Sequence, residues 1–178
     1  GWDEPALGEW CVRDLAGHTY RAFTTVLSYS AASDDKVEIE RPVDYFLKVL
    51  GDNVGQKQVA ELGRAAGLEI IDDPRMMVRG FAMYVKNKLD DLGDDHIMGT
   101  VVGGMRLIDY LPTRTFELII HTMDLAKAVG VDAKPPEKGM TATLEILGQI
   151  ALYRGHASDL LLAATGRGGL PVGFSVLG

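Results

Sequence analysis

The 178-residue chain has a single cysteine, no long apolar run and no cluster of basic residues. Because Cys11 has no second cysteine to pair with, no internal disulfide can form, and we expect a reducing, cytoplasmic location. No apolar run approaches the roughly 20 residues that a bilayer-spanning helix needs, so we expect no membrane partner. The net charge of −7 and the scattered Lys and Arg residues argue against nucleic acid as a partner.

The residues that are present have the composition of an ordinary globular domain, with 47% hydrophobic and 24% charged residues. A chain of this length buries a substantial core without disulfide support. It opens at Gly1-Trp2-Asp3, without an initiator methionine and close to an expected helix start. We therefore interpret residues 1–178 as a single domain that lacks some N-terminal residues, and we expect a monomer or homodimer.

Apolar residues recur at spacings of three and four along the chain, which predicts an all-α fold. We expect residues 93–104, which are rich in glycine, to form a loop, and residues 107–111 to form a short turn. Gly130 is expected to cap a helix that Pro112 opens. Helices with such connections favour a bundle whose sites are built from facing side chains. The expected helices cover 12–28, 42–66 with a bend at Gly51 and Gly55, 73–93, 112–130 and 141–165.

The most informative motif lies in the helix expected over 112–130, where Glu117 and His121 are four positions apart. This spacing places both side chains on one helix face, one turn apart. The rest of the helix is apolar, which predicts that its polar stripe, completed by Asp124, is buried in the bundle. A buried carboxylate needs a cation, a proton or hydrogen bonds. A metal ion meets that need, and so does a structural pair in which Glu117 and His121 bond to each other.

A third ligand would complete an open zinc site, in which three protein ligands leave a fourth position for water or substrate. His18, in the first expected helix, is the leading candidate, although a lone histidine is more often an ordinary core or surface residue. His96 in the glycine-rich segment ranks second, and His156 ranks third. Cys11, seven positions before His18, is either a thiolate ligand or a small buried residue near the helix start.

Two further polar residues accompany the Glu117–His121 pair. Asp124 is placed to orient a metal-binding side chain through a hydrogen bond, or to cap a neighbouring element. Arg114 lies one turn before Glu117, where it either pairs with that acid or reaches an anionic substrate. The residues alone leave these alternatives open.

Three segments of the chain resemble one known family. GEWCVRDLAGH, residues 8–18, resembles the tryptophan, Val-Arg-Asp-Leu and histidine signature that begins the metal-binding domain of mycothiol-dependent maleylpyruvate isomerase-like proteins, in the DinB-like superfamily. RTFELIIHTMDLAKAVG, residues 114–130, resembles the second signature of that family, and LLLAATGRGGLPVGFSVLG, residues 160–178, resembles its closing segment. Residues 28–104 share only helical character with the family.

The resemblance implies a DinB-like bundle, with a four-helix core and additional short helices, that binds zinc or another divalent transition metal through His18, Glu117 and His121. It implies a thiol S-transferase or isomerase-like enzyme that uses mycothiol or a related low-molecular-weight thiol and a small-molecule electrophile. A metal lowers the pKa of a bound thiol and presents it as a thiolate. The candidates for catalytic roles are Trp10, Arg114 and Asp124.

The chain departs from the family pattern in three respects. Cys11 stands where the signature commonly has a hydroxyl residue, the sequence reaches Gly178 without the family's second C-terminal domain, so we expect that domain to be absent, and we expect the usual first helix to be reduced to residues 1–7. Two other functions therefore stay open. One is a metal-dependent hydrolase on the same residues, with bound water as the nucleophile. The other is a non-catalytic metal-binding bundle protein.

Overall fold

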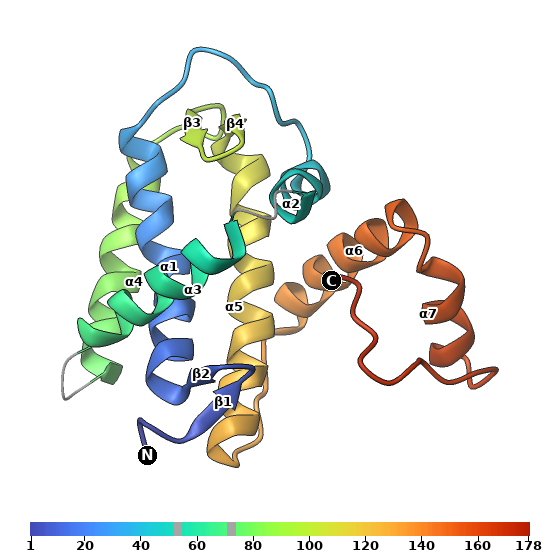
Figure 1. Ribbon diagram of the computed structural model, residues 1–178. Helices are drawn as coiled ribbons and strands as arrows, with labels where there is room; N and C mark the ends of the chain where they lie inside the picture. The colour runs from blue at the N-terminus through green and yellow to red at the C-terminus, as the bar shows by residue number, and fades with distance from the viewer. Residues whose placement is uncertain (52–54, 71–73) are drawn as a thin grey trace.

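The structure is a computed structural model that describes residues 1–51, 55–70 and 74–178. Within these ranges it contains seven helices and two small antiparallel sheets, so the prediction of an all-α fold is confirmed (Figure 1). The helices are α1 (Val12–Ala31), α2 (Pro42–Gly51), α3 (Gly55–Leu68), α4 (Pro74–Asp90), α5 (Leu107–Val129), α6 (Glu137–Tyr153) and α7 (Ala157–Ala164). The strands are β1 (Pro5–Leu7), β2 (Trp10–Cys11), β3 (Ile97–Thr100) and β4 (Gly103–Arg106).

The two longest helices, α1 and α5, run side by side in opposite directions at the centre of the molecule (Figure 1). Helix α1 also contacts α3 and α4, whereas α5 contacts α2 and α6. The β1–β2 and β3–β4 hairpins lie at opposite ends of this central pair. As a result, the functional residues expected on α1 and α5 face each other across one interface.

Helices α1 and α3 approach closely because glycines lie where they meet. A Cβ atom on Gly17 would overlap backbone atoms of Gly63 and Gly67, and one on Gly67 would lie 2.7 Å from the carbonyl oxygen of Arg13. At Gly63 the same atom would lie 3.2 Å from the Cβ atom of His18. The glycines therefore let α3 cross α1 directly at the helical turn that carries His18.

The hydrophobic core lies between α1, α2, α5, α6 and the β3–β4 hairpin. The rings of Phe46 on α2 and Phe116 on α5 lie 4.8 Å apart between their centroids, so the face of α5 next to Glu117 is held by aromatic packing. The largest side chains buried to below 2% exposure are Tyr110, Phe116, Leu15, Ile39, Met98, Met105, Ile150, Val43 and Thr113.

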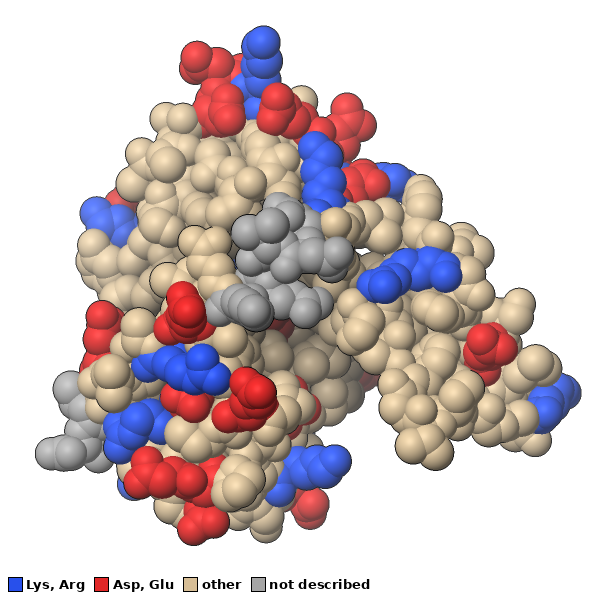
Figure 2. Space-filling view, viewed as in Figure 1, with Lys and Arg blue, Asp and Glu red and all other residues tan. Residues whose placement is uncertain are grey.

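The surface over α6 and α7 carries few charged side chains (Figure 2). Several large apolar residues are exposed there, among them Leu144, Leu152 and Leu161, each 66–68% exposed. In the described parts of the chain, no helix combines the length and the apolar character needed to cross a membrane.

Three expected helix boundaries are wrong. In place of the single helix expected over 42–66, the structure describes two helices, α2 ending at Gly51 and α3 beginning at Gly55, and residues 52–54 lie outside the described part. The helix expected over 141–165 is likewise divided, because Gly155 adopts a left-handed φ of 79° between α6 and α7. Pro112 lies inside α5, which begins five residues earlier at Leu107.

Of the other local predictions, one is confirmed and others differ from the structure. Gly130 does cap α5, in the left-handed conformation with φ of 71°. Helix α4 ends at Asp90 rather than near Gly93, and the Asp73 part of its expected cap lies outside the described residues. Residues 5–11, ahead of the first helix, contribute the β1–β2 hairpin, which was not expected.

Residues 97–106 form a hairpin where a loop was expected. Backbone from the segment after α1 lies against it: the N–H group of Gly99 donates to the carbonyl oxygen of Ala32 at 2.7 Å, and that of Glu38 donates to the carbonyl oxygen of Gly104 at 2.8 Å. A Cβ atom on Gly99 or Gly104 would overlap this backbone. These glycines thus permit a close backbone approach rather than a loop.

Candidate metal centre

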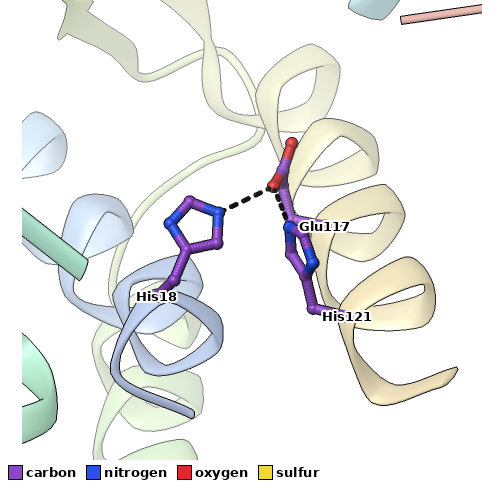
Figure 3. Close-up of side chains that lie close together, drawn as sticks. All are labelled: His18, Glu117 and His121. Atoms are coloured by element: carbon purple, nitrogen blue, oxygen red, sulfur yellow. Dashed lines mark hydrogen bonds and ion pairs between the residues drawn. The ribbon is translucent and has the colours of Figure 1, made fainter. Parts of the chain in front are cut away.

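Two adjacent helices bring His18, Glu117 and His121 together. His18 lies in the second turn of α1, and the other two side chains lie one turn apart on α5 (Figure 3). One Glu117 oxygen, Oε2, lies 3.2 Å from Nε2 of His121 and 3.7 Å from Nε2 of His18. One ligand atom from each of the three residues lies within 4.8 Å of the others.

The spacing of these atoms suits a shared metal ion. Ligands held about 2.0–2.2 Å from a tetrahedral zinc ion are roughly 3.4 Å apart, and the two observed distances lie on either side of that value. Two imidazole nitrogens and one carboxylate oxygen are a donor set used by zinc and related divalent metals. Both histidine side chains are 14% exposed and Glu117 is 23% exposed, so the group is largely shielded from water but reachable.

The protonation of Glu117 and His18 also suits metal binding. Burial by itself raises the pKa of Glu117, but the hydrogen bond with His121, the nearby His18 ring and the charge of Arg114 outweigh it and hold the pKa well below its usual range. Burial lowers the pKa of His18, and the attraction of Glu117 does not restore it. The site therefore offers an ionised carboxylate and one neutral imidazole.

His121 lies between two carboxylates. Its Nδ1 atom is 3.1 Å from Oδ2 of Asp124, and its Nε2 atom is 3.2 Å from Oε2 of Glu117. Burial lowers the pKa of His121, but these two acids outweigh burial and raise it. When Nδ1–H donates to Asp124, a neutral ring presents its Nε2 lone pair to the Glu117 carboxylate. Two acceptors then face each other, so a proton or a cation must lie between them.

An aromatic contact rather than a hydrogen bond positions the ring of His18. The ring of Trp10, on β2, lies 4.6 Å from it between centroids, and the ring of His121 lies at the same distance edge-on. The Nδ1 atom of His18 is buried and has no hydrogen-bond partner within the described residues. Trp10 therefore packs against the ring of His18, which is a candidate metal ligand.

The other ligand candidates lie elsewhere. Cys11 is the N-cap residue of α1, where its backbone N–H donates to the carboxylate of Asp14 at 3.2 Å. The Nε2 atom of His96 lies 3.0 Å from the carbonyl oxygen of Ser30, and the ring of His156 packs against Phe174. None of the three belongs to the His/Glu/His group that the described residues form.

A cavity of about 470 Å³ opens beside the group. His18 and Glu117 form part of its wall, with two arginines, Arg21 and Arg114, next to them. The sequence alone did not single out Arg21, although its position three residues after His18 places it on the same helix face. The remaining lining residues are Ala22, Thr25, Tyr29, Tyr45, Phe46, Val49, Leu50, Gln58, Val59, Leu62, Val101, Val102 and Leu177.

The fold and the site together define a helical protein in which two histidines and a glutamate converge beside a cavity with an apolar and aromatic wall. Comparisons of the chain with protein-family models, with curated proteins and with solved structures find no match. The resemblance of three segments to the mycothiol-dependent isomerase-like family therefore stays a prediction from the sequence.

Proposed function

We propose that this protein is a zinc-dependent thiol S-transferase or isomerase-like enzyme on a DinB-like bundle, using mycothiol or a related low-molecular-weight thiol. The observation that carries the proposal is the convergence of His18, Glu117 and His121 at the wall of a cavity large enough for small molecules. The family resemblance of the segments that hold these residues selects thiol chemistry over other metal chemistry.

In this proposal the three side chains would hold the metal beside the cavity, whose wall includes His18 and Glu117. The metal, when bound, lowers the pKa of a thiol so that sulfur is presented as a thiolate. Asp124 accepts the Nδ1–H of His121 and so directs Nε2 toward Glu117. Trp10 limits rotation of the His18 ring. A thiol cosubstrate and a single cysteine suit a reducing compartment, and we propose the cytoplasm.

Metal content is the first test. Protein purified without chelator should hold about one zinc or related ion per chain, as three-ligand sites do. His121→Ala and Glu117→Gln should abolish it, whereas His156→Ala and Glu145→Gln, which change the same residue types outside the group, should not. Wild-type protein that neither carries metal nor takes up added zinc would overturn the proposal.

Turnover is the second test, and it separates the three functions. Conjugation of an electrophile that needs both the thiol and the metal supports the transferase. Metal-dependent turnover of esters or amides without added thiol would replace it with a hydrolase, in which bound water is the nucleophile. Stoichiometric metal with neither activity would identify a non-catalytic metal-binding bundle protein.

A further inference from the structure

Two arginines lie one helical turn from the metal-ligand candidates, on the cavity wall. Arg21 follows His18 by three positions, and Arg114 precedes Glu117 by three. Three residues advance a helix by about 4.5 Å. Because α1 and α5 run in opposite directions, both arginines lie on the same side of the His/Glu/His group, toward the β3–β4 end (Figure 1).

Arg114 is held in place but keeps donors available. Its guanidinium lies over the rings of Tyr110 and Tyr45, at 4.9 and 5.4 Å from their centroids, and its Nε–H donates to the hydroxyl of Thr113 at 3.0 Å. A guanidinium has five N–H groups, and these contacts engage only one of them as a hydrogen-bond donor. As far as the described residues go, the other four are left for a ligand in the cavity.

Within the described parts of the chain, neither arginine has a carboxylate in contact. Among the residues that the structure describes, no carboxylate oxygen lies within 4.0 Å of the guanidinium nitrogens of Arg21 or Arg114, although Arg41, Arg64 and Arg106 each have such a partner. Glu117, the acid on the cavity wall, contacts the two histidines instead. The cavity wall therefore carries the positive charges of Arg21 and Arg114, while the negative charge of Glu117 is already in contact with the two histidines.

The surroundings of the two guanidiniums make an anionic ligand favourable. Burial lowers the pKa of Arg21; among its neighbours Tyr29 raises that pKa and the charge of Arg114 lowers it, so the two guanidiniums repel each other. Burial raises the pKa of Tyr29 to about 12, so this phenol stays neutral and supplies no compensating charge. A carboxylate placed between two guanidiniums would remove the repulsion and accept charge-assisted hydrogen bonds.

The remaining residues of the cavity wall indicate the kind of molecule that would carry this carboxylate. Beyond the arginines the lining is mainly aliphatic and aromatic, and includes Phe46, Val49, Leu50, Val59 and Leu62. This surface offers burial to an apolar body, and Thr25, Tyr29, Tyr45 and Gln58 add hydroxyl and amide groups to the wall. The wall therefore suits a ligand whose body is mainly apolar.

We propose that Arg21 and Arg114 bind the carboxylate of a monocarboxylate with an aryl or alkyl body, and that this body lies along the apolar wall of the cavity. The assignment rests on the proposed function in one respect, namely that the acid is the electrophile of the thiol reaction: the thiol would add across an activated C=C bond in the body of the acid, with sulfur bonding to one carbon and the thiol proton going to the other, so that no group leaves. The carboxylate and the reacting end then lie one helical turn apart, at the arginines and at the His/Glu/His group.

The test measures binding of 2-naphthoate to metal-free protein, by calorimetry, with neutral 2-naphthamide as the matched ligand. We expect naphthoate to bind on the order of tenfold or more tightly than the amide, since charge-assisted hydrogen bonds are lost with the charge. Arg21→Gln and Arg114→Gln should each weaken naphthoate on a similar scale without affecting the amide. Arg79→Gln, the same charge change on an exposed residue of α4, should leave naphthoate binding unchanged.

Several outcomes would overturn the inference: no naphthoate binding, equal binding of acid and amide, or equal weakening by Arg79→Gln. If Arg114→Gln fails to fold, Arg114→Lys keeps the charge but not the planar fork, and should bind naphthoate with intermediate affinity. Naphthoate binding should persist in His121→Ala. Because the assay uses metal-free protein, it can succeed while the zinc–thiol proposal fails, and the reverse.

Discussion

The Nδ1 atom of His121 lies 3.1 Å from Oδ2 of Asp124, one turn along α5. This contact fixes which nitrogen of the ring faces Glu117, and it does so from the side away from that acid. A carboxylate behind a histidine is a common arrangement at metal centres, because it orients the ring and increases its basicity. The pair is thus the most direct structural support for reading His121 as a ligand rather than as a packing residue.

Asp124→Asn should weaken metal binding while leaving the fold intact. The amide can still accept a hydrogen bond but loses the charge that orients His121, and outer partners of this kind typically change metal affinity by about 10–100-fold. Competition with a chromogenic zinc chelator measures the change. Asp132→Asn, the same substitution at an exposed position after α5, is the matched control and should bind zinc as wild type does. Equal affinity in the two variants would contradict the orienting role.

Metal should stabilise the protein more at alkaline than at acidic pH. His121 has a raised pKa, so in metal-free protein its protonated contact with Glu117 and Asp124 contributes stability below the unfolded value of 6.5. That contribution is lost as the pH rises through the folded pKa. Bound metal replaces the proton and acts in the opposite direction, because the ligands must be deprotonated.

The measurement is the midpoint of thermal unfolding with zinc and with chelator, at about pH 5.5 and about pH 8, on either side of the histidine range. The gap between the two midpoints should be larger at the higher pH. In His121→Ala the gap should shrink at both values. A gap that is larger at the acidic pH would contradict the assignment of His121 as the proton-sensitive ligand.

The local part of the site could be predicted from the sequence, and the long-range part could not be predicted from residue spacing. Glu117, His121 and Asp124 share a helix, so their spacing alone places them on one stripe. His18 lies on a different helix, and no periodicity links it to α5. The residues alone offer His18 ahead of His96 and His156, and the family signature around His18 supports that choice. Only the tertiary structure shows that Arg21 and the aromatic residues of α2 line the same cavity.

Glycine explains most of the errors in the predicted fold. Gly99 and Gly104 favour a loop by local rules, yet they lie in strands because backbone from residues 32–38 approaches them too closely for a side chain. Gly155 divides a helix that apolar spacing continues through. The same residue type permits close approach, ends a helix or bends it, and only the neighbouring segments decide which.

Gly17→Ala should destabilise the fold and, with it, the metal centre. The new methyl group would overlap the backbone of α3 at Gly63 and Gly67, which has no flexible side chain to yield. Overpacking of this kind costs about 1–3 kcal/mol of unfolding free energy. Urea denaturation measures the loss. Gly80→Ala on α4, where a Cβ atom meets nothing within 4 Å, is the control and should be neutral or stabilising by up to about 1 kcal/mol.

Metal binding should change the fluorescence of Trp10 and not that of Trp2. The indole of Trp10 stacks on the ring of His18 with centroids 4.6 Å apart, so a cation bound to that imidazole alters the charge next to the fluorophore. Trp2 instead packs under the guanidinium of Arg13, at 4.9 Å. Titration of metal-free protein with zinc should therefore give a saturable emission change that survives Trp2→Phe and disappears in Trp10→Phe. A change that survives Trp10→Phe and is lost in Trp2→Phe would place the bound metal away from His18, since only Trp10 contacts that ring.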